Sequence, residues 1–328
     1  MIKVSVITPI YKTETFIERC SKSLFSQTLK EVEFIFVDDA SPDNSIKILE
    51  SLLDTEFLER KQEVRIIRHT ENKGASISRN DGLAQAKGEY VHWCDSDDWM
   101  EPDLLEKLYS AAKANDADIA YCDFYLSFEK NDRYMSNPQY DTAEDMLRKG
   151  FLGGRMKYNL WNKIARRNLY EKIGVVFPNG HSMGEDMAMI RIAAVADKVA
   201  YVPEALYHYV KLNEVAYSNT YTSKKLEDTR YNVSLTTSFL KEKFGDSMDK
   251  EISLFKLSIK LPFLMTGDKE MYKLWREWYP EADKYVNANP DLPKRTRLLQ
   301  QMAAKGQWWY VKMYYLLVYK VMYGLIYK

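Results

Sequence analysis

Short apolar runs alternate with amphipathic helical patterns through the first 125 residues, and few folds can accommodate this alternation. Buried strands separated by helices predict right-handed crossovers and a mainly parallel sheet covered by helices on both faces, that is, an α/β protein. The expected strands are 4–8, 33–37, 64–69, 90–94 and 119–123, and the expected helices are 16–27, 44–53, 74–86 and 102–114.

Polar residues gather directly after these strands. Ligands of open parallel sheets bind beyond the carboxyl ends of the strands, so side chains that carry chemistry are expected there. Their common position along the strands predicts one ligand site at this edge of the sheet. The segments concerned are Thr8-Pro9-Ile10-Tyr11, Asp38-Asp39-Ala40-Ser41, Asn72-Lys73-Gly74 and Asp95-Ser96-Asp97-Asp98-Trp99.

The segment after the fourth strand is strongly acidic. Asp95 and Asp97 stand at alternate positions on a tight turn, where both side chains can enter one cleft. With Asp98 they form a cluster of carboxylates that repel one another unless a cation lies among them. Mn²⁺ and Mg²⁺ are typically held by one or two carboxylates together with phosphate oxygens. The alternative is an acidic cap for the helix that begins near Pro102.

Two neighbouring segments also allow either a ligand-binding or a purely structural interpretation. Asp39 can accept hydrogen bonds from a nucleobase or a ribose, or it can serve the turn geometry alone. Arg79 can reach a diphosphate at the start of the helix after Lys73-Gly74, or it can lie on a solvated helix face. The glycine-rich loops of dinucleotide-binding and P-loop proteins do not occur in the sequence, which argues against both cofactor classes.

A Glu-Asp pair, Glu185-Asp186, follows Gly184 and opens a helix predicted to run to about residue 196. A carboxylate at a helix start is stabilised in its charged form by the helix dipole. Asp186 can therefore act as a base toward a sugar hydroxyl in the transition state, or it can simply cap the helix.

Together these segments resemble the family 2 glycosyltransferases, a large inverting group with a GT-A fold. The resemblance is dense over residues 1–125, looser to about Tyr209, and rests on five motifs in the family's order. The fold it implies is a Rossmann-like, mainly parallel sheet flanked by helices, followed by a helical C-terminal extension. The motifs are Val4-Ser5-Val6-Ile7-Thr8-Pro9-Ile10-Tyr11, Val37-Asp38-Asp39-Ala40-Ser41-Pro42-Asp43, Asn72-Lys73-Gly74 with Ser78-Arg79-Asn80-Asp81-Gly82, Asp95-Ser96-Asp97-Asp98-Trp99, and Glu185-Asp186.

The resemblance also implies an activity: inverting transfer of a hexosyl or N-acetylhexosaminyl unit from a nucleotide sugar, with a UDP-sugar favoured. The implied acceptor is a glycan or a polyprenyl-diphosphate-linked glycan of bacterial surface polysaccharide synthesis. Asp186 is the implied base, and Asp95 and Asp97 are the implied ligands of Mn²⁺ or Mg²⁺, with Asp98 as an alternative to Asp97. Nucleotide-sugar contacts are implied for Thr8, Pro9, Tyr11, Asp39, Lys73, Arg79, Asp95 and Ser96. The competing class is a non-catalytic nucleotide-sugar- or glycan-binding module, against which the intact carboxylates count.

Two positions depart from the family pattern. Ala40 stands where Gly is usual after the Asp-Asp pair, and Lys12 stands where Asn is frequent after Tyr11. Trp161-Asn162-Lys163 and Tyr207-His208-Tyr209 are similar to segments of members that build bacterial surface polysaccharides. His208 could complete a metal shell, but a lone His among tyrosines is more often a packing residue.

The remaining chain is expected to be helical at 224–243, at 252–265 and from about residue 298 onward. We divide the chain into a nucleotide-sugar-binding half at 1–125, an acceptor-side half at 126–212 and a helical region at 213–328. The last 37 residues contain seven basic residues and no acidic one, and they mix Trp and Tyr with Lys. Such a tail suits a membrane headgroup region, or it packs on the catalytic domain or on a second subunit of a homo-oligomer.

The composition indicates which partners and which cellular compartment to expect. Basic and acidic residues each number 47, and the resulting net charge of zero argues against a nucleic-acid partner. Three widely spaced cysteines predict buried free thiols in a reducing compartment. The first residues have the pattern of a strand and not of a signal peptide, and no apolar run reaches 18 residues. We expect a cytoplasmic protein, peripheral at the inner face of the plasma membrane if the tail binds lipid.

Overall fold

The computed structural model describes residues 1–211 and 222–318, with the side chain of Glu185 excepted. The chain forms two compact units. The first consists of Met1–Met146 and Tyr158–Thr236, and the second of Leu147–Lys157 and the chain from Thr237 onward.

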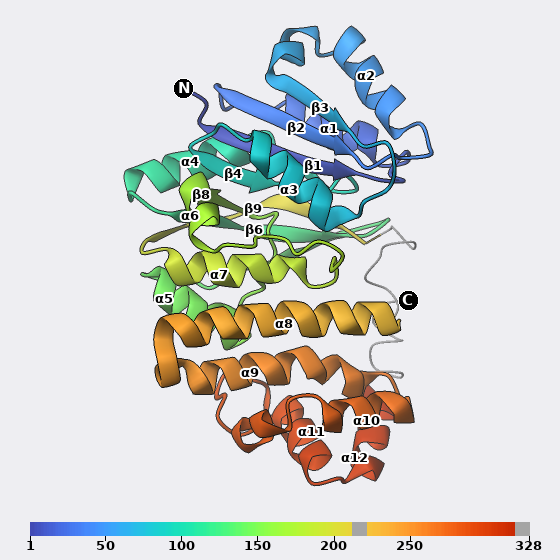
Figure 1. The fold of residues 1–328 in the computed structure, drawn as a ribbon, viewed down its shortest axis with the longest axis vertical. Coiled ribbons are helices and arrows are strands. Elements are labelled where there is room, and N and C mark those ends of the chain that lie inside the picture. The colour runs from blue at the N-terminus through green and yellow to red at the C-terminus, as the bar shows by residue number, and fades with distance from the viewer. Residues whose placement is uncertain (212–221, 319–328) are drawn as a thin grey trace. The chain divides into compact units, whose positions relative to one another are not determined.

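The first unit is built on a sheet that has nine strands among the described residues, in the order β3-β2-β1-β4-β8-β6-β9-β5, with β7 paired to β6 (Figure 1). The strands β3, β2, β1 and β4 pair in parallel, as do β6 and β9, whereas β5, β7 and β8 run antiparallel to their neighbours. The expected α/β class with a mainly parallel sheet is confirmed. The bounds are β1 (Val4–Ile10), β2 (Val32–Asp38), β3 (Val64–Arg68), β4 (Tyr90–Trp93), β5 (Trp99–Met100), β6 (Ile119–Ser127), β7 (Asp132–Met135), β8 (Lys163–Arg166) and β9 (Val199–Val210).

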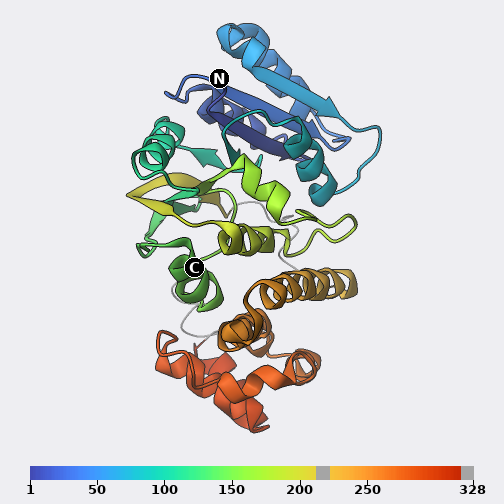
Figure 2. The same cartoon turned by 60° about the vertical axis from the view of Figure 1, so that its left-hand side comes forward.

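Helices cover both faces of this sheet (Figures 1 and 2). On one face, helices α1, α2 and α4 bury apolar side chains such as Leu24, Leu49 and Leu108 in one cluster with alternate residues of β1 and β2. On the other face, α3 approaches Ile7 of β1, and α6 places Tyr170 against Trp93 of β4. The bounds are α1 (Ile17–Phe25), α2 (Ser45–Thr55), α3 (Ala75–Gln85), α4 (Leu104–Ala114), α6 (Arg167–Lys172) and α7 (Ala188–Val195).

The direction of the strand order changes at β1. The chain proceeds from β1 outward through β2 and β3, and then returns to β4 on the other side of β1. Such a switch point opens a crevice at the carboxyl ends of the strands, because the loops on its two sides diverge. The loops that follow β1, β2 and β4 therefore border the crevice expected to bind ligands.

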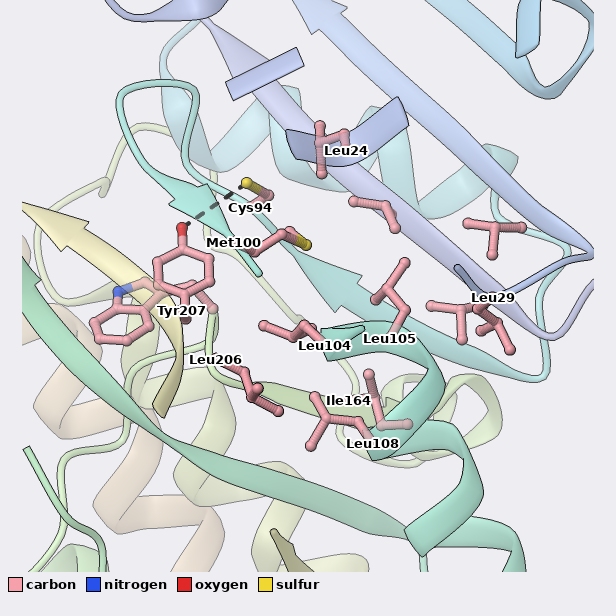
Figure 3. Close-up of a cluster of buried hydrophobic side chains, with 14 of the residues drawn as sticks. Leu24, Leu29, Cys94, Met100, Leu104, Leu105, Leu108, Ile164, Leu206 and Tyr207 are labelled. Atoms are coloured by element: carbon pink, nitrogen blue, oxygen red, sulfur yellow. Dashed lines mark hydrogen bonds between the residues drawn. The ribbon is translucent and has the colours of Figure 1, made fainter. Parts of the chain in front are cut away.

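A buried cluster holds the turn between β4 and β5 in place (Figure 3). Cys94 before the turn and Met100 after it are both buried in one cluster with Leu24, Leu104 and Leu206. The close packing of these side chains anchors the two ends of the turn, so its acidic residues project from a rigid base. All three cysteines are buried and free, as expected.

The sequence pattern predicted the middle of this unit less well. The weak periodicity of residues 128–182 favours a loop-rich segment with a helical piece at 143–149. The helical piece is present as α5 (Ala143–Asp145) and the π-helix Met146–Leu152, but the segment also contains β7, β8 and α6. Strand β8 has four residues and lies antiparallel between β4 and β6, so its burial comes from distant neighbours and leaves little local pattern.

The second unit is helical among its described residues, which confirms the expected helical C-terminal region. Its buried side chains include Phe255, Leu264, Trp275, Leu299 and Val311. Residues 319–328 of the predicted tail lie outside the described residues. In the part of the chain that is described, no helix combines the length and the apolar character needed to cross a bilayer. The helices are α9 (Asp249–Lys260), α10 (Lys269–Glu277), α11 (Lys294–Ala304) and α12 (Trp308–Tyr314), while α8 (Ser223–Phe244) crosses the division between the units.

Gly82 on α3 allows this helix to approach the sheet closely. A Cβ atom at Gly82 would collide with Cγ2 of Ile7 and would lie 3.3 Å from Cγ2 of Val37. We predict that Gly82→Ala lowers the free energy of unfolding by about 1–3 kcal/mol, because the overpacked helix must shift. Urea denaturation measures this effect. Gln85→Ala, at an exposed position of the same helix, is the control and should change stability by less than about 0.5 kcal/mol. Equal stabilities of the two variants would contradict the close approach.

Candidate active site

The residues predicted after the first strand lie at its carboxyl end. Strand β1 extends to Ile10, so Thr8 and Pro9 belong to the strand and not to the loop after it. Thr8 is buried, and its hydroxyl has no hydrogen-bond partner among the described residues. Tyr11 follows the strand with 41% of its surface exposed. Of the predicted donor contacts in this segment, Thr8 and Pro9 thus lie in the strand itself, and Tyr11 presents an exposed ring beyond its end.

Asp39 joins the loop after β2 to the start of α3. Its carboxylate is nearly buried and accepts hydrogen bonds of 2.8 Å from the backbone N–H groups of both Lys73 and Gly74. His69 Nδ1 lies 2.7 Å from the same carboxylate, and His69 Nε2 lies 2.9 Å from Asp81. Asp39 therefore fixes the loop that begins α3. His69 belongs to none of the five sequence motifs, although it also stands at the end of an expected strand.

The turn after β2 is stabilised by other side chains. Asp38 accepts a hydrogen bond from the backbone of Ser41, and Asp43 accepts one from the backbone of Ser45 at the start of α2. Turn geometry alone therefore does not account for Asp39, whose carboxylate contacts a different loop.

Three backbone positions around the site are left-handed. Gly74 has a φ of 88° and a ψ of 160°, a region that essentially only glycine adopts. Ala40 and Lys12 have φ values of 52° and 56°. Both departures from the family pattern thus lie at left-handed positions. Gly adopts this conformation more easily because it has no Cβ atom to crowd the following carbonyl, and Asn does so because its short side chain can hydrogen-bond locally.

Arg79 connects α3 to the acidic turn after β4. Its side chain is nearly buried, and Nη2 donates a hydrogen bond of 2.9 Å to Oδ1 of Asp95. The guanidinium also lies over the ring of Phe177, 5.9 Å from its centroid. The interpretation of Arg79 as part of a solvated helix face is therefore wrong.

Asp98 turns away from the crevice and braces the acidic turn. It is fully buried; Oδ2 accepts a 2.9 Å hydrogen bond from the Tyr207 hydroxyl, and Oδ1 accepts one of 2.8 Å from the Val210 backbone. The Tyr207 hydroxyl also accepts a hydrogen bond from the backbone of Asp95. Burial, followed by the charges of Asp97 and Asp95, raises the pKa of Asp98 well above its ordinary value. Asp95 and Asp97 are the partly exposed carboxylates of the turn, and Ser96 between them is buried.

The acidic turn does not cap the next helix. Strand β5 lies between the turn and α4, whose N-cap is Asp103. The capping alternative for Asp95 and Asp97 is therefore wrong.

Asp186 lies in the 3-10 turn Glu185–Met187 that precedes α7. The N-cap of α7 is Met187, so Asp186 is not the capping residue of that helix. The carboxylate of Asp186 is partly buried. Its charge contributes to raising the pKa of Tyr158, which burial raises first.

The four predicted carboxylates all influence one side chain, that of Tyr209. Burial raises the pKa of Tyr209, and the charges of Asp98, Asp95, Asp97 and Asp186 raise it further. Because the interaction between charges weakens with distance, all four carboxylates lie within electrostatic range of this hydroxyl. Asp186 and the acidic turn thus act on a common group, although some 90 residues separate them in the sequence.

The segment Trp161-Asn162-Lys163 supports this arrangement from within the sheet. Lys163 Nζ donates hydrogen bonds to the backbone oxygen of Asn159 at 2.8 Å and to Oδ1 of Asn162 at 2.6 Å. Burial lowers the pKa of Lys163 to about 7, while the charge of Asp186 acts in the opposite direction. Trp161 stacks on both Tyr207 and Tyr209, with ring centroids 4.6 and 5.2 Å apart.

His208 packs on the other side of β9. Its ring stacks on Trp99 at a centroid distance of 3.4 Å. Its Nδ1 lies 3.1 Å from the Ser127 hydroxyl, and its Nε2 lies 2.8 Å from Glu101. With both ring nitrogens engaged, the geometry favours packing over metal ligation for His208.

The carboxylates of the turn fit a divalent cation. No group of three His, Cys, Asp or Glu side chains within residues 1–211 and 222–318 is arranged to hold a metal. Mg²⁺ and Mn²⁺ do not require such a group, because one or two carboxylates suffice when a diphosphate and water supply further oxygens. Asp95 and Asp97 meet this requirement, whereas both oxygens of Asp98 accept hydrogen bonds from the protein.

The strand order, with its switch point at β1, and the acidic turn after the fourth parallel strand are typical of the GT-A fold. A comparison with solved structures agrees: S. aureus TarS 1–349 in complex with UDP-GlcNAc superposes with a TM-score of 0.71 at 20% sequence identity, over 96% of this chain and 91% of TarS 1–349.

The model of the family described as Glycosyl transferase family 2 matches residues 5–195, and this chain belongs to that family. EpsH of Bacillus subtilis is 31% identical over 247 residues, which cover 73% of this chain and 69% of EpsH. The poly(ribitol-phosphate) beta-glucosyltransferase of Bacillus spizizenii is 26% identical over 313 residues, 88% of this chain but only 46% of that relative.

We predict that Tyr207→Phe destabilises the protein by about 1–3 kcal/mol, because loss of the hydroxyl leaves a buried oxygen of Asp98 without its donor. Chemical denaturation measures the change. Tyr11→Phe removes a hydroxyl from an exposed ring and serves as the control, with an expected change below about 0.5 kcal/mol. Wild-type stability of Tyr207→Phe would show that Asp98 does not depend on this contact.

Proposed function

We propose that this chain is an inverting glycosyltransferase that moves a sugar from a nucleoside-diphosphate sugar to a hydroxyl of a glycan or lipid-linked acceptor in bacterial surface polysaccharide synthesis. The observation that carries the proposal is the acidic turn after the fourth parallel strand, where Arg79 of α3 donates a hydrogen bond to Asp95. The charges of Asp95, Asp97 and Asp186 all act on one group, the Tyr209 hydroxyl, which supports their assignment to one site. A UDP-sugar is the favoured donor, a choice supported by the UDP-GlcNAc bound to TarS. A polymeric acceptor is supported by the name of the poly(ribitol-phosphate) relative.

Donor binding is assigned to the loops around α3. Asp39 holds the start of α3, and Gly74 uses only one of the two acceptor positions on Oδ2, so this oxygen can still accept a hydrogen bond from a nucleobase N–H. Arg79 supplies a fixed positive charge toward the diphosphate, held in place by Asp95. Thr8, Pro9, Tyr11, Lys73 and Ser96 complete the proposed donor contacts.

Asp95 and Asp97 are the residues that would hold Mn²⁺ or Mg²⁺. A divalent cation at this place supplies charge neutralisation for the departing diphosphate. Arg79 acts on the same side of the reaction through a positive charge that needs no reorganisation.

Asp186 is proposed to be the base. It accepts the proton of the acceptor hydroxyl while the hydroxyl oxygen attacks the anomeric carbon and the bond to the diphosphate breaks. The acceptor oxygen enters opposite the leaving diphosphate, so a single displacement inverts the anomeric configuration. Two observations support this role: Asp186 is not the capping residue of α7, and its charge acts on the Tyr209 hydroxyl together with the charges of Asp95 and Asp97.

The test of the base is Asp186→Asn. We expect near-normal donor affinity and a turnover reduced by about 10²- to 10⁴-fold, because the amide cannot accept the proton. This loss corresponds to about 3–5 kcal/mol of transition-state stabilisation. Calorimetry with the donor and an assay of nucleoside diphosphate release measure the two quantities. Full turnover would assign the base to another residue, and weakened donor binding would assign Asp186 to the donor site.

The metal assignment is tested by Asp97→Asn. We expect Mn²⁺-dependent binding of UDP, measured by calorimetry, to weaken by about 10-fold or more, because the cation loses a charged ligand. Asp54→Asn, at an exposed carboxylate on α2, is the matched control and should bind UDP as the wild type does. Unchanged Mn²⁺ dependence in Asp97→Asn would remove this residue from the proposed metal site.

We also propose that the C-terminal region contacts a membrane surface. Four exposed apolar side chains lie close together in a segment rich in basic residues, at the spacing of one helix face: Trp309, Met313, Leu316 and Leu317. Amphipathic aromatic and basic surfaces of this kind suit the headgroup region of anionic bilayers. This contact would keep the enzyme close to a lipid-linked acceptor.

Flotation with phosphatidylglycerol vesicles tests this contact. Removal of the chain from Leu298 onward would also remove buried residues such as Leu299 and Val311, so surface substitutions are the better choice. We expect the double variant Trp309→Ser, Leu317→Ser to lose vesicle binding, whereas Leu58→Ser, at an exposed leucine of the first unit, keeps it. Failure of the wild type to float would favour packing of the tail on protein.

A further inference from the structure

One histidine of this chain is built into a partly exposed surface. Three of the four histidines, at positions 69, 92 and 208, have side chains that are at most 4% exposed, whereas that of His181 is 20% exposed. His181 also belongs to the loop that leads to Asp186, and the proposed mechanism leaves it without a role.

A buried carboxylate orients the ring of His181. Its Nδ1 lies 3.1 Å from Oδ1 of Asp228 on α8, and the side chain of Asp228 is 1% exposed. Lys224 Nζ lies 2.9 Å from the same oxygen. A carboxylate between these groups acts as the acceptor, so Nδ1 of His181 donates the hydrogen. The neutral ring therefore carries its acceptor lone pair on Nε2.

An exposed aromatic ring lies against His181. Tyr231 of α8 stacks on the imidazole with a centroid distance of 3.9 Å and an interplanar angle of 4°. Tyr231 remains 45% exposed. The pair thus offers an apolar ring and an oriented nitrogen next to each other.

The loop that carries His181 is held from two sides. Toward the proposed donor site, α3 contacts it through Asn80, which donates to the backbone oxygen of Phe177 at 2.6 Å. Toward α8, Asn232 donates to the backbone oxygens of Met183 at 3.0 Å and His181 at 3.2 Å, and its side chain is 1% exposed. The backbone oxygen of His181 also accepts a hydrogen bond of 3.3 Å from the Ser76 hydroxyl of α3. The ring of His181, by contrast, contacts Asp228 and Tyr231 of α8.

The stereochemistry of single displacement relates this arrangement to the acceptor. The attacking hydroxyl approaches the anomeric carbon from the side opposite the diphosphate, so the base and the acceptor ring lie away from the groups that bind the diphosphate. Arg79 and Asn80 both belong to α3, on the donor side of the loop. His181 stands five residues before Asp186 on the same loop, and its ring contacts α8.

We propose that Tyr231 and His181 form a subsite for the acceptor saccharide. The ring of Tyr231 packs against the apolar face of a pyranose, and Nε2 of His181 accepts a hydrogen bond from one of its hydroxyls. The ligand class is a neutral pyranoside with free hydroxyl groups. The inference rests on the proposed function, because it takes Asp186 as the base that faces the acceptor.

Chemical modification tests the subsite without turnover. Diethyl pyrocarbonate acylates exposed imidazole, so mass spectrometry of the full chain should find His181 modified first, with the other three histidines as internal controls. Methyl glycosides of glucose, galactose and N-acetylglucosamine are the probes, and sorbitol at equal concentration is the control polyol. We expect at least one pyranoside to slow acylation of His181 by about threefold or more. Equal rates with every pyranoside and with sorbitol would overturn the proposal, as would protection by UDP alone.

Kinetics separate this inference from the function on which it rests. Tyr231→Ala should raise the KM for the acceptor by about 5- to 10-fold and leave the donor dissociation constant unchanged, whereas Tyr231→Phe keeps the ring and should restore the KM. A wild-type acceptor KM in Tyr231→Ala, together with lost turnover in Asp186→Asn, would overturn the subsite alone. A raised KM together with full turnover in Asp186→Asn would overturn the base assignment and retain the subsite.

Discussion

The buried carboxylate of Asp98 is the contact on which the rest of the candidate site depends. A carboxylate removed from water is costly unless donors surround it, and here Tyr207 and the Val210 backbone satisfy it from 109 and 112 residues away. These bonds tie the turn after β4 to β9, the strand that brings Tyr209 to the site. With Asp98 committed to the interior, Asp95 and Asp97 remain as the partly exposed carboxylates of the turn.

Helix α3 joins this turn to the other loops. Asp39 holds its first residues through two backbone hydrogen bonds, Arg79 reaches Asp95, and Asn80 reaches the loop before Asp186. Gly82 brings the same helix close to β1. A displacement of α3 would therefore alter the proposed donor contacts and the loop of the proposed base together, because they share one rigid element.

The part of the fold with regular alternation could be predicted from the sequence, and the part without it could not. Strands β1 to β4 and the helices between them follow the expected ranges within a few residues, because each strand is an apolar run bounded by turn residues. Strand β5 has only two residues, and β8 begins with Lys163 and ends with Arg166, so neither forms an apolar run that could be recognised. The local sequence also does not distinguish His69, because one of its carboxylate partners, Asp39, lies in the loop after β2 and the other, Asp81, lies on α3.

The sequence by itself determined the fold class, the family and the places along the chain where chemical groups gather, because these depend on local periodicity and on short motifs. Only the tertiary structure decided which of the neighbouring polar side chains are buried and which stay partly exposed at the site. Asp97 and Asp98 are adjacent and chemically identical, and nothing local distinguishes them. Asp98 faces inward because Tyr207 and Val210 meet it there, and Arg79 is buried because Asp95 lies opposite it. Partners that are distant in sequence set these orientations, so no local pattern could have predicted them.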